Sequence, residues 1–189
     1  MRMIQQMISW LPQLLNGAKI TILLTLCAVS MGLILSIFLA LGKMSKNKIL
    51  SGICSAYIFF FRGTPLLMQL YFIYFGLPQI NMALTINSRF FAAFLAFSLN
   101  SAAYCSEFIR AAIQSIDRGQ FEASKALGLS KAQTMQLVIF PQSIRRLVPS
   151  VANEFIMVLK DASLVSIIAL ADLTKVTRAI SSSTGTAMV

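Results

Sequence analysis

The chain contains no histidine and few charged residues. Among its 189 residues are three Cys and six Asp+Glu, and charged residues make up only 12% of the total. The absence of His excludes His-based acid–base chemistry and His-ligated metal sites. The three cysteines are far apart and set in apolar runs, which favours free buried thiols over a disulfide framework. No GxxxxGK[ST] loop is present, so the chain does not hydrolyse ATP by that route.

Apolar residues, in contrast, are abundant. They make up 57% of the chain, against roughly 45–50% in soluble domains. This composition excludes intrinsic disorder, and a soluble domain of this size cannot bury so much apolar surface. The 16 Lys+Arg leave a net charge of +10, which is too spread out for a nucleic-acid surface and is typical of the charge that orients a membrane protein. We therefore expect an all-α membrane protein that binds neither nucleic acid nor metal.

Apolar runs predict one interfacial helix and four membrane spans. Apolar residues recur at helical spacing over residues 3–15, which predicts an amphipathic helix in the membrane interface over residues 1–16, anchored by Trp10. The clearest span is the uncharged stretch Ile20–Gly42, which is long enough to cross ~30 Å of hydrocarbon. A helix along the membrane surface is expected to break at Gly63-Thr64-Pro65 before the second span. The four expected spans cover residues 20–42, 66–77, 90–109 and 147–170.

Positively charged loops orient these spans. The loop after the first span carries four Lys/Arg and no acid, and the loop after the third carries six Lys/Arg. The loop between them has only Arg89. The positive-inside rule therefore places the first and third loops in the cytoplasm and the N-terminus outside.

The third loop, at about residues 111–146, is predicted to form a short amphipathic helix over residues 120–127. Its apolar side consists of Phe121, Ala123, Ala126 and Leu127. Gly128 is placed to end this helix, and Ser130 is placed to cap a second helix that Pro141 and Pro149 separate from the fourth span. Such a helix is either a plain solvated element or fits an apolar groove on a partner protein.

The loop resembles the EAA loop of binding-protein-dependent ABC importer permeases. That pattern is Glu-Ala-Ala, three residues, Gly, nine residues and then Ile-x-Leu-Pro. The chain has Glu122, Ala123, Gly128 and Pro141 at the same spacing, with Ser124 in place of the second Ala. Further motifs are similar to the polar amino-acid permease branch. These are RGTPLL at 62–67, NSAAY at 100–104, Glu107-x-x-Arg110 and KDxSL at 160–164, and the resemblance covers about Gly17 to Arg178.

The resemblance implies a type I ABC importer transmembrane domain over residues 17–189, in the cytoplasmic (inner) membrane of a prokaryote. In that family the loop helix docks in a cleft of a separate subunit that binds ATP and magnesium, so this chain is expected to have no cofactor and no catalytic residue. The implied coupling residues are Gln120, Glu122, Ala123, Leu127 and Gly128. The implied partners are two ATP-binding subunits, a second permease copy or sister permease, an extracytoplasmic solute-binding protein and membrane lipid.

Polar residues of the third span are candidates for the substrate pathway. Asn100, Tyr104 and Glu107 fall on one helix face. Such residues either line a pathway or join helices through hydrogen bonds. Glu107 is placed to pair with Arg110 at i+3.

The fourth span contains three charged residues. A carboxylate within a span costs at least ~2.5 kcal/mol on insertion scales, so Glu154 must face protein or water. It either recognises the ammonium of an amino-acid substrate, together with Met157, or pairs internally. The adjacent opposite charges Lys160 and Asp161 suit a helix break near an external gate. The candidate pathway is therefore Asn100, Tyr104, Glu154, Met157, Lys160 and Asp161.

The chain departs from the family at its end. The resemblance implies a fifth span after Asp172-Leu173, and the sequence stops at Val189 without one. Two alternatives to a working permease therefore stay open. One is a truncated, inactive permease, and the other is a small self-assembling channel that needs no coupling loop.

Overall fold

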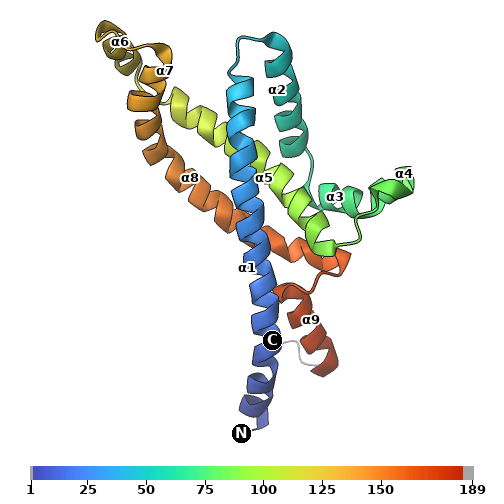
Figure 1. Ribbon diagram of the computed structural model, residues 1–189. Coiled ribbons are helices and arrows are strands. Elements are labelled where there is room, and N and C mark those ends of the chain that lie inside the picture. The colour runs from blue at the N-terminus through green and yellow to red at the C-terminus, as the bar shows by residue number, and fades with distance from the viewer. Residues whose placement is uncertain (1, 185–189) are drawn as a thin grey trace. The chain divides into compact units, whose positions relative to one another are not determined.

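The computed structural model describes the backbone of residues 2–184 and the side chains of residues 8–183, and these residues form helices joined by short loops (Figure 1). The longer α-helices are α1 (Arg2–Lys43), α2 (Lys48–Gly63), α5 (Arg89–Gln114) and α8 (Phe140–Asp161). The shorter ones are α3 (Leu66–Tyr71), α4 (Leu77–Ile80), α6 (Arg118–Ala126), α7 (Lys131–Gln133) and α9 (Leu173–Thr184). Two π-helical segments, η1 (Phe72–Gly76) and η3 (Thr134–Ile139), and two 3-10 segments, η2 (Met82–Leu84) and η4 (Ala162–Ile168), connect them. The described part of the chain contains no strand, as the sequence predicts.

Helix α1 runs through the regions expected to form the interfacial helix and the first span. The structure contains no break near residue 16, although the change in apolar patterning there suggested two elements. The part Ile8–Lys43 is long and apolar enough to cross a membrane. The interfacial placement of residues 1–16 stays a prediction. The side chains of Met3, Ile4 and Met7, on which it partly depends, lie outside the described residues.

The predicted break between α2 and the second span is confirmed. Helix α2 ends at Gly63 and α3 begins at Leu66, because Pro65 lacks an N–H group and disfavours helical backbone at Thr64. The side-chain amide of Gln69 donates hydrogen bonds to the Thr64 carbonyl (3.1 Å) and hydroxyl (2.8 Å), which satisfies polar groups at the break. By length and composition, Ile8–Lys43 and the broken pair on either side of this break are the candidate spans among the described residues.

Helix α8 contains two prolines that were expected to separate it from the helix before it. Pro141 is the second residue of α8, but the π-helical segment η3 runs into α8 without a break, so the expectation that Pro141 ends a helix is wrong. Pro149 lies inside α8, so the expectation that it separates two helices is wrong. Helices in membranes tolerate proline because neighbouring groups satisfy the freed carbonyl. Helix α8 ends at Asp161 and passes into the 3-10 segment η4, which confirms the predicted break.

The described residues pack into two compact units. The first joins Thr64–Ser98 to the beginning of α1 and to the chain from Met157 onward, and the second joins Met31–Gly63 to Leu99–Ile156. In the second unit, α5 contributes a set of small, fully buried residues. These are Ser101, Ala102, Ala103, Cys105 and Ser106. Small residues let helix backbones approach closely in a membrane.

In the first unit, α9 begins against α1. Asp172 is fully buried, and its carboxylate accepts hydrogen bonds from the backbone N–H groups of Thr174 (3.0 Å) and Lys175 (3.1 Å), which makes it the N-cap of α9. The Leu173 N–H donates to the hydroxyl of Thr21 (3.2 Å). A Cβ atom on Gly17 would lie only 3.0 Å from Leu173 Cα, so glycine permits this contact.

The fifth span implied by the resemblance concerns the chain after Leu173. Helix α9 occupies Leu173–Thr184. Residues 185–189, which that expectation also covers, lie outside the described residues.

Candidate functional site

The predicted loop helix is α6, and it begins two residues earlier than expected. The sequence predicted a helix over residues 120–127, and α6 covers Arg118–Ala126. Its N-cap is Asp117, whose carboxylate accepts a hydrogen bond of 2.7 Å from the Gly119 N–H. The pattern of apolar side chains does not reveal this earlier start, because neither Arg118 nor Gly119 has an apolar side chain.

Gly128 ends α6 as predicted. It adopts φ +78°, which side chains disfavour. Its N–H donates to the Lys125 carbonyl (3.0 Å) and the Leu129 N–H donates to the Ser124 carbonyl (3.1 Å), which is the Schellman arrangement at a helix end.

The next helix begins with a reciprocal cap. Ser130 accepts a hydrogen bond from the Gln133 N–H (3.3 Å), and the Gln133 side chain accepts one from the Ser130 N–H (2.9 Å). This capping box confirms the predicted role of Ser130. Together with Gly128, it fixes the backbone on the C-terminal side of α6.

The apolar side of α6 is exposed. Leu127 is 81% exposed and Phe121 is 36% exposed. The other predicted coupling residues are also exposed, namely Gln120, Glu122, Ala123 and Gly128. Within α6, only Ser124 is buried, and its hydroxyl donates to the Gln120 carbonyl of the same helix (2.7 Å). The substitution of Ser124 for the second Ala of the EAA pattern therefore leaves no polar group unsatisfied.

Two contacts fasten this region to the start of α8. The side-chain amide of Gln142 donates to Gln120 Oε1 (3.0 Å) and to the Val138 carbonyl (3.0 Å). The guanidinium of Arg146 donates to the Ser115 carbonyl, just before α6. The contacts with Gln120 and Ser115 could not be predicted from the sequence, since Gln142 and Arg146 are distant from these partners along the chain. As a result, two hydrogen bonds hold this region on α8. One involves Gln120 in α6 and the other involves Ser115, which precedes α6.

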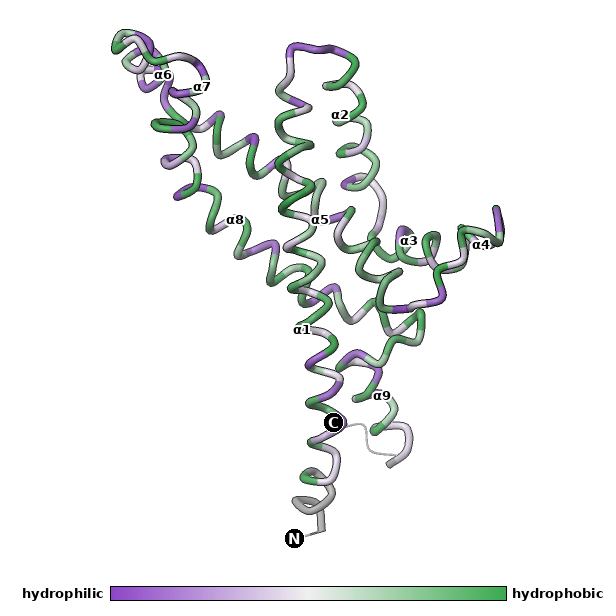
Figure 2. Tube along the Cα trace, in the orientation of Figure 1, coloured by the Kyte–Doolittle hydropathy of each residue, from purple (hydrophilic) through white to green (hydrophobic). Residues whose placement is uncertain are grey.

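The loop between α1 and α2 and the region around α6 and α7 are both hydrophilic, which is consistent with both lying in water. Figure 2 shows hydrophilic residues gathered in the loop between α1 and α2 and around α6 and α7, and hydrophobic residues along much of α1 and α2. These are the two Lys/Arg-rich loops that the positive-inside rule assigned to the cytoplasm.

The third-span candidates Asn100 and Tyr104 both contact the C-terminal part of α2. Asn100 is 9% exposed, and its side-chain amide donates to the Phe61 carbonyl (3.1 Å). The ring of Tyr104 is half-buried and lies 5.2 Å from the Arg62 guanidinium carbon. Asn100 thus joins α5 to α2, and its part in a substrate pathway stays a prediction.

Glu107 is the centre of an ion-pair cluster. It pairs with Arg110 (2.7 Å), as its i+3 spacing predicts, and also with Lys43 (2.6 Å). A third cation, Arg62, lies 3.9 Å away. Lys43 and Arg62 come from α1 and α2, so no local signal could have identified them.

The fourth-span candidates differ in burial. Glu154 is 6% exposed and belongs to the second unit. Met157 and Lys160 are exposed, Asp161 is half-buried, and all three belong to the first unit.

After the break at Asp161, one residue has a strained backbone conformation, and two cationic side chains donate hydrogen bonds to its carbonyl. Ala169 has φ 60°, a conformation unusual for residues other than glycine. Its carbonyl accepts hydrogen bonds from Lys175 Nζ (2.8 Å) and Arg89 Nη1 (3.5 Å). This segment is part of the region expected to form an external gate.

The described residues are helical, include helices long and apolar enough to cross a membrane, and present an exposed, capped loop helix, as expected of a transporter's membrane subunit. Residues 32–188 match the family model described as the binding-protein-dependent transport system inner membrane component. The chain belongs to this family.

Named relatives are amino-acid permeases. The chain is 43% identical over 162 residues to the arginine transport system permease protein ArtQ of Bacillus subtilis, covering 86% of this chain and 73% of that protein. It is 42% identical over 165 residues to the L-cystine transport system permease protein TcyB of Bacillus subtilis, covering 87% of this chain and 69% of that protein. A solved structure described as an amino acid ABC transporter with histidines is 42% identical, with a TM-score of 0.91 over 97% of this chain and 85% of that chain.

These similarities confirm the resemblance to amino-acid permeases of ABC importers and the type I transmembrane fold. The chain is an inner-membrane permease component of a binding-protein-dependent importer. It is not itself an enzyme, since in such importers the ATPase is a separate subunit. Membership of the family implies ATP-binding subunits and a solute-binding protein as partners.

Proposed function

We propose that the chain forms half of the translocation pathway of an ATP-driven importer for polar amino acids. It works with a second permease copy or sister permease, two ATP-binding subunits that bind ATP and magnesium, and an extracytoplasmic solute-binding protein. The names of the relatives support an amino-acid substrate. The chain crosses the cytoplasmic membrane several times, with the N-terminus outside.

The exposed apolar side of α6 carries this proposal. A rigid, capped helix with Leu127 81% exposed fits an apolar groove on a partner better than it fits water. We assign the groove to the ATP-binding subunit, with Gln120, Glu122, Ala123, Leu127 and Gly128 in contact.

Movement of α6 reaches the spans through α8. Closure of the two ATP-binding subunits pushes α6, and the hydrogen bond between Gln120 and Gln142 ties this helix to α8. The contact of Arg146 with the Ser115 carbonyl ties the approach to α6 to the same helix. A rigid-body shift of the spans then exchanges outward-facing and inward-facing states.

The substrate pathway is proposed to include Asn100, Tyr104, Glu154, Met157, Lys160 and Asp161. A buried carboxylate in a span is expensive, which favours a functional role for Glu154. Its charge suits the ammonium group of an amino acid and favours a cationic or amide side chain.

Replacement of Leu127 by glutamate tests the docking of α6. Leu127→Glu places a charge where an apolar groove is expected, so the affinity for the ATP-binding subunit should fall about tenfold or more. The measurement is the amount of ATP-binding subunit that co-purifies with the permease, together with ATP hydrolysis by the reconstituted complex. Membrane insertion should be unchanged, because Leu127 is exposed in this chain.

Met82→Glu is the matched control. Met82 is 85% exposed and lies in η2, which is expected on the opposite side of the membrane. This variant should retain the ATP-binding subunit at the wild-type level. If Leu127→Glu also retains it and hydrolyses ATP normally, the docking assignment is wrong. Uptake that continues without ATP would favour the channel alternative.

A further inference from the structure

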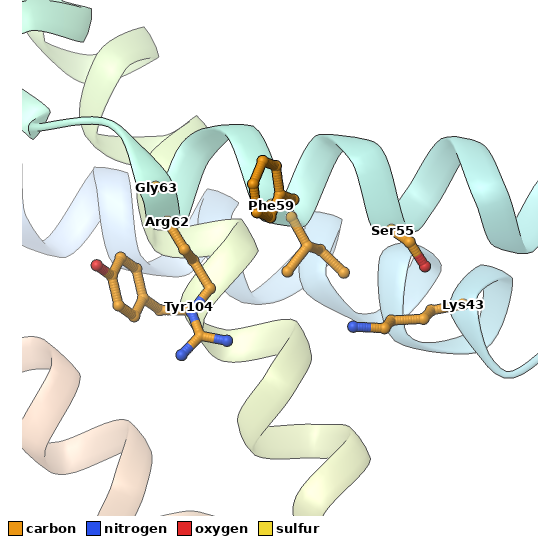
Figure 3. Close-up of a pocket in the computed structure, with 7 residues that line it drawn as sticks. Lys43, Ser55, Phe59, Arg62, Gly63 and Tyr104 are labelled. Carbon is orange, nitrogen blue, oxygen red and sulfur yellow. The ribbon is translucent and has the colours of Figure 1, made fainter.

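A cavity of about 500 Å³ lies in the second unit, between α2 and its neighbours (Figure 3). It is lined by Lys43, Ser55, Ile58, Phe59, Arg62, Gly63 and Tyr104. Its lining comes from the end of α1, from one face of α2 and from α5. None of the expected coupling residues on α6 lines it, and of the expected pathway residues only Tyr104 does.

The cavity is positively charged. Lys43, Arg62 and Arg110 surround the single carboxylate of Glu107, so three cations share one anion. Figure 3 shows the Lys43 amine and the Arg62 guanidinium on the cavity side of their helices. A ligand that completes this charge balance must be an anion.

Arg62 is the cation best placed to bind it. Its guanidinium lies 3.9 Å from Glu107, which is beyond hydrogen-bond distance, and packs on the ring of Tyr104 at 5.2 Å. The ring orients the guanidinium without using its N–H donors, of which arginine has five. Lys43 donates to Glu107 at 2.6 Å, and its ammonium carries further donors. The hydroxyl of Ser55 lines the same cavity.

The rest of the lining is apolar. Ile58 and Phe59 lie on the α2 face that also carries Ser55 and Arg62, and Phe59 is 81% exposed. Further apolar side chains of α2 are exposed, namely Ile49, Ile53 and Phe60. A free inorganic anion would not contact this apolar surface. A molecule with an anionic headgroup and apolar chains would contact both the cationic and the apolar parts of the lining.

The cavity lies where lipid phosphates are expected. Lys43 directly follows the uncharged stretch Ile20–Gly42, so it marks the end of the hydrocarbon region. On the proposed topology this is the cytoplasmic side, where anionic lipids attract basic residues beside membrane helices.

We propose that this cavity binds the headgroup of an anionic phospholipid. Arg62 and Lys43 donate to the phosphate, and the exposed ring of Phe59 contacts the acyl chains. The bound lipid connects α2 to the end of α1 and to α5. This inference depends on the proposed topology and is independent of the proposed substrate and of the docking of α6.

Lipid retention by a charge variant and its matched control tests the proposal. Purified permease complex is incubated with dioleoylphosphatidylglycerol, dioleoylphosphatidylcholine or sodium phosphate. Native mass spectrometry then counts bound lipid, and the melting temperature is measured in parallel. Arg62→Gln removes the proposed phosphate ligand. Lys48→Gln removes the same charge from an exposed position of the same helix outside the cavity.

Wild type and Lys48→Gln should bind phosphatidylglycerol equally and gain the same thermal stability from it. Arg62→Gln should bind it about tenfold more weakly, the cost of a lost charge-assisted hydrogen bond. Arg62→Lys keeps the charge and should keep most of the binding, which covers the case in which Arg62→Gln fails to fold.

Three results would overturn the proposal. Equal binding by Arg62→Gln and Lys48→Gln would assign the effect to general surface charge. Equal stabilisation by phosphatidylcholine would show that the phosphatidylglycerol charge is not recognised. Equal stabilisation by sodium phosphate would show a site for a free anion rather than a lipid.

Discussion

Glu107 shows how one side chain links three helices. It lies on α5, and its ion-pair partners Lys43 and Arg62 come from the ends of α1 and α2, while Arg110 is its neighbour along α5. The Glu107 side chain is only 12% exposed, whereas those of Lys43 and Arg110 are 27% and 30% exposed. The carboxylate is therefore largely out of water and depends on its cations.

Replacing Glu107 with glutamine should destabilise the chain. Glu107→Gln keeps the shape of the side chain and leaves neighbouring cations uncompensated. Because the cations are partly exposed, we expect a loss of about 2 kcal/mol, below the range for fully buried pairs. Thermal unfolding of the purified protein in detergent micelles measures it.

Glu122→Gln serves as the control for Glu107→Gln. Glu122 is an exposed acid of the same unit, on α6. Its replacement should change the stability by less than about 0.5 kcal/mol. Equal stability losses in the two variants would refute the structural role of the Glu107 cluster.

For single residues, the sequence was sufficient to predict interactions between residues that are close along the chain. The Glu107–Arg110 pair follows from helical spacing, and the turn at Gly128 follows from the special backbone freedom of glycine. Lys43 and Arg62 could not be assigned as partners of Glu107, since that requires knowing how three helices pack. For the same reason the cavity lined by Arg62 was not predicted.

The positions of helix ends could likewise be predicted where they depend on local sequence, and not where they depend on packing. The break at Thr64-Pro65, the cap at Ser130 and the end of α8 at Asp161 all follow from local chemistry and are present. Pro149 is the counterexample, since it lies inside α8 where a proline was expected to end a helix. In a membrane protein, neighbouring groups can satisfy the carbonyl that proline frees, so local propensity does not decide where this helix ends.

Removing the N-cap of α9 should loosen that helix. Asp172→Ala loses the hydrogen bonds to the N–H groups of Thr174 and Lys175. The expected cost is about 1 kcal/mol. Hydrogen exchange of peptides from α9 measures it, and exchange should be faster in the variant.

Asp172→Asn separates capping from charge. Asparagine caps helices about as well as aspartate, so this variant should exchange at nearly the wild-type rate. If both variants exchange equally fast, the charge of Asp172 rather than its cap stabilises α9. If neither differs from wild type, the cap contributes nothing measurable.

At the scale of the whole molecule, two loops rich in Lys/Arg set the expected orientation. The composition and the long apolar runs were sufficient to predict an all-helical membrane protein. Only Ile8–Lys43 and the broken pair formed by α2 with Leu66–Ile80 qualify as spans by composition among residues 2–184. Helices α5 and α8 contain polar and charged residues that lower their mean hydropathy. A criterion based on composition alone therefore does not identify them as spans.

Single cysteines test the orientation. The native cysteines Cys54 and Cys105 are buried and Cys27 is half-buried, so background labelling should be low. A membrane-impermeant maleimide should label Met82→Cys in right-side-out vesicles and Lys125→Cys in inside-out vesicles, since both positions are exposed. Labelling of both positions from the same side would refute the proposed topology.

The exposed apolar side of α6 also has a consequence for the supply of subunits in the cell. On the proposed topology and docking, a copy made in excess of its ATP-binding partner would present the exposed side chains of Leu127 and Phe121 to the cytoplasm. Quality-control proteases and chaperones recognise such exposed apolar segments in unassembled chains. On the proposed docking of α6, we expect the abundance of the partner to set how many copies persist, so that the stoichiometry of the importer is adjusted after synthesis.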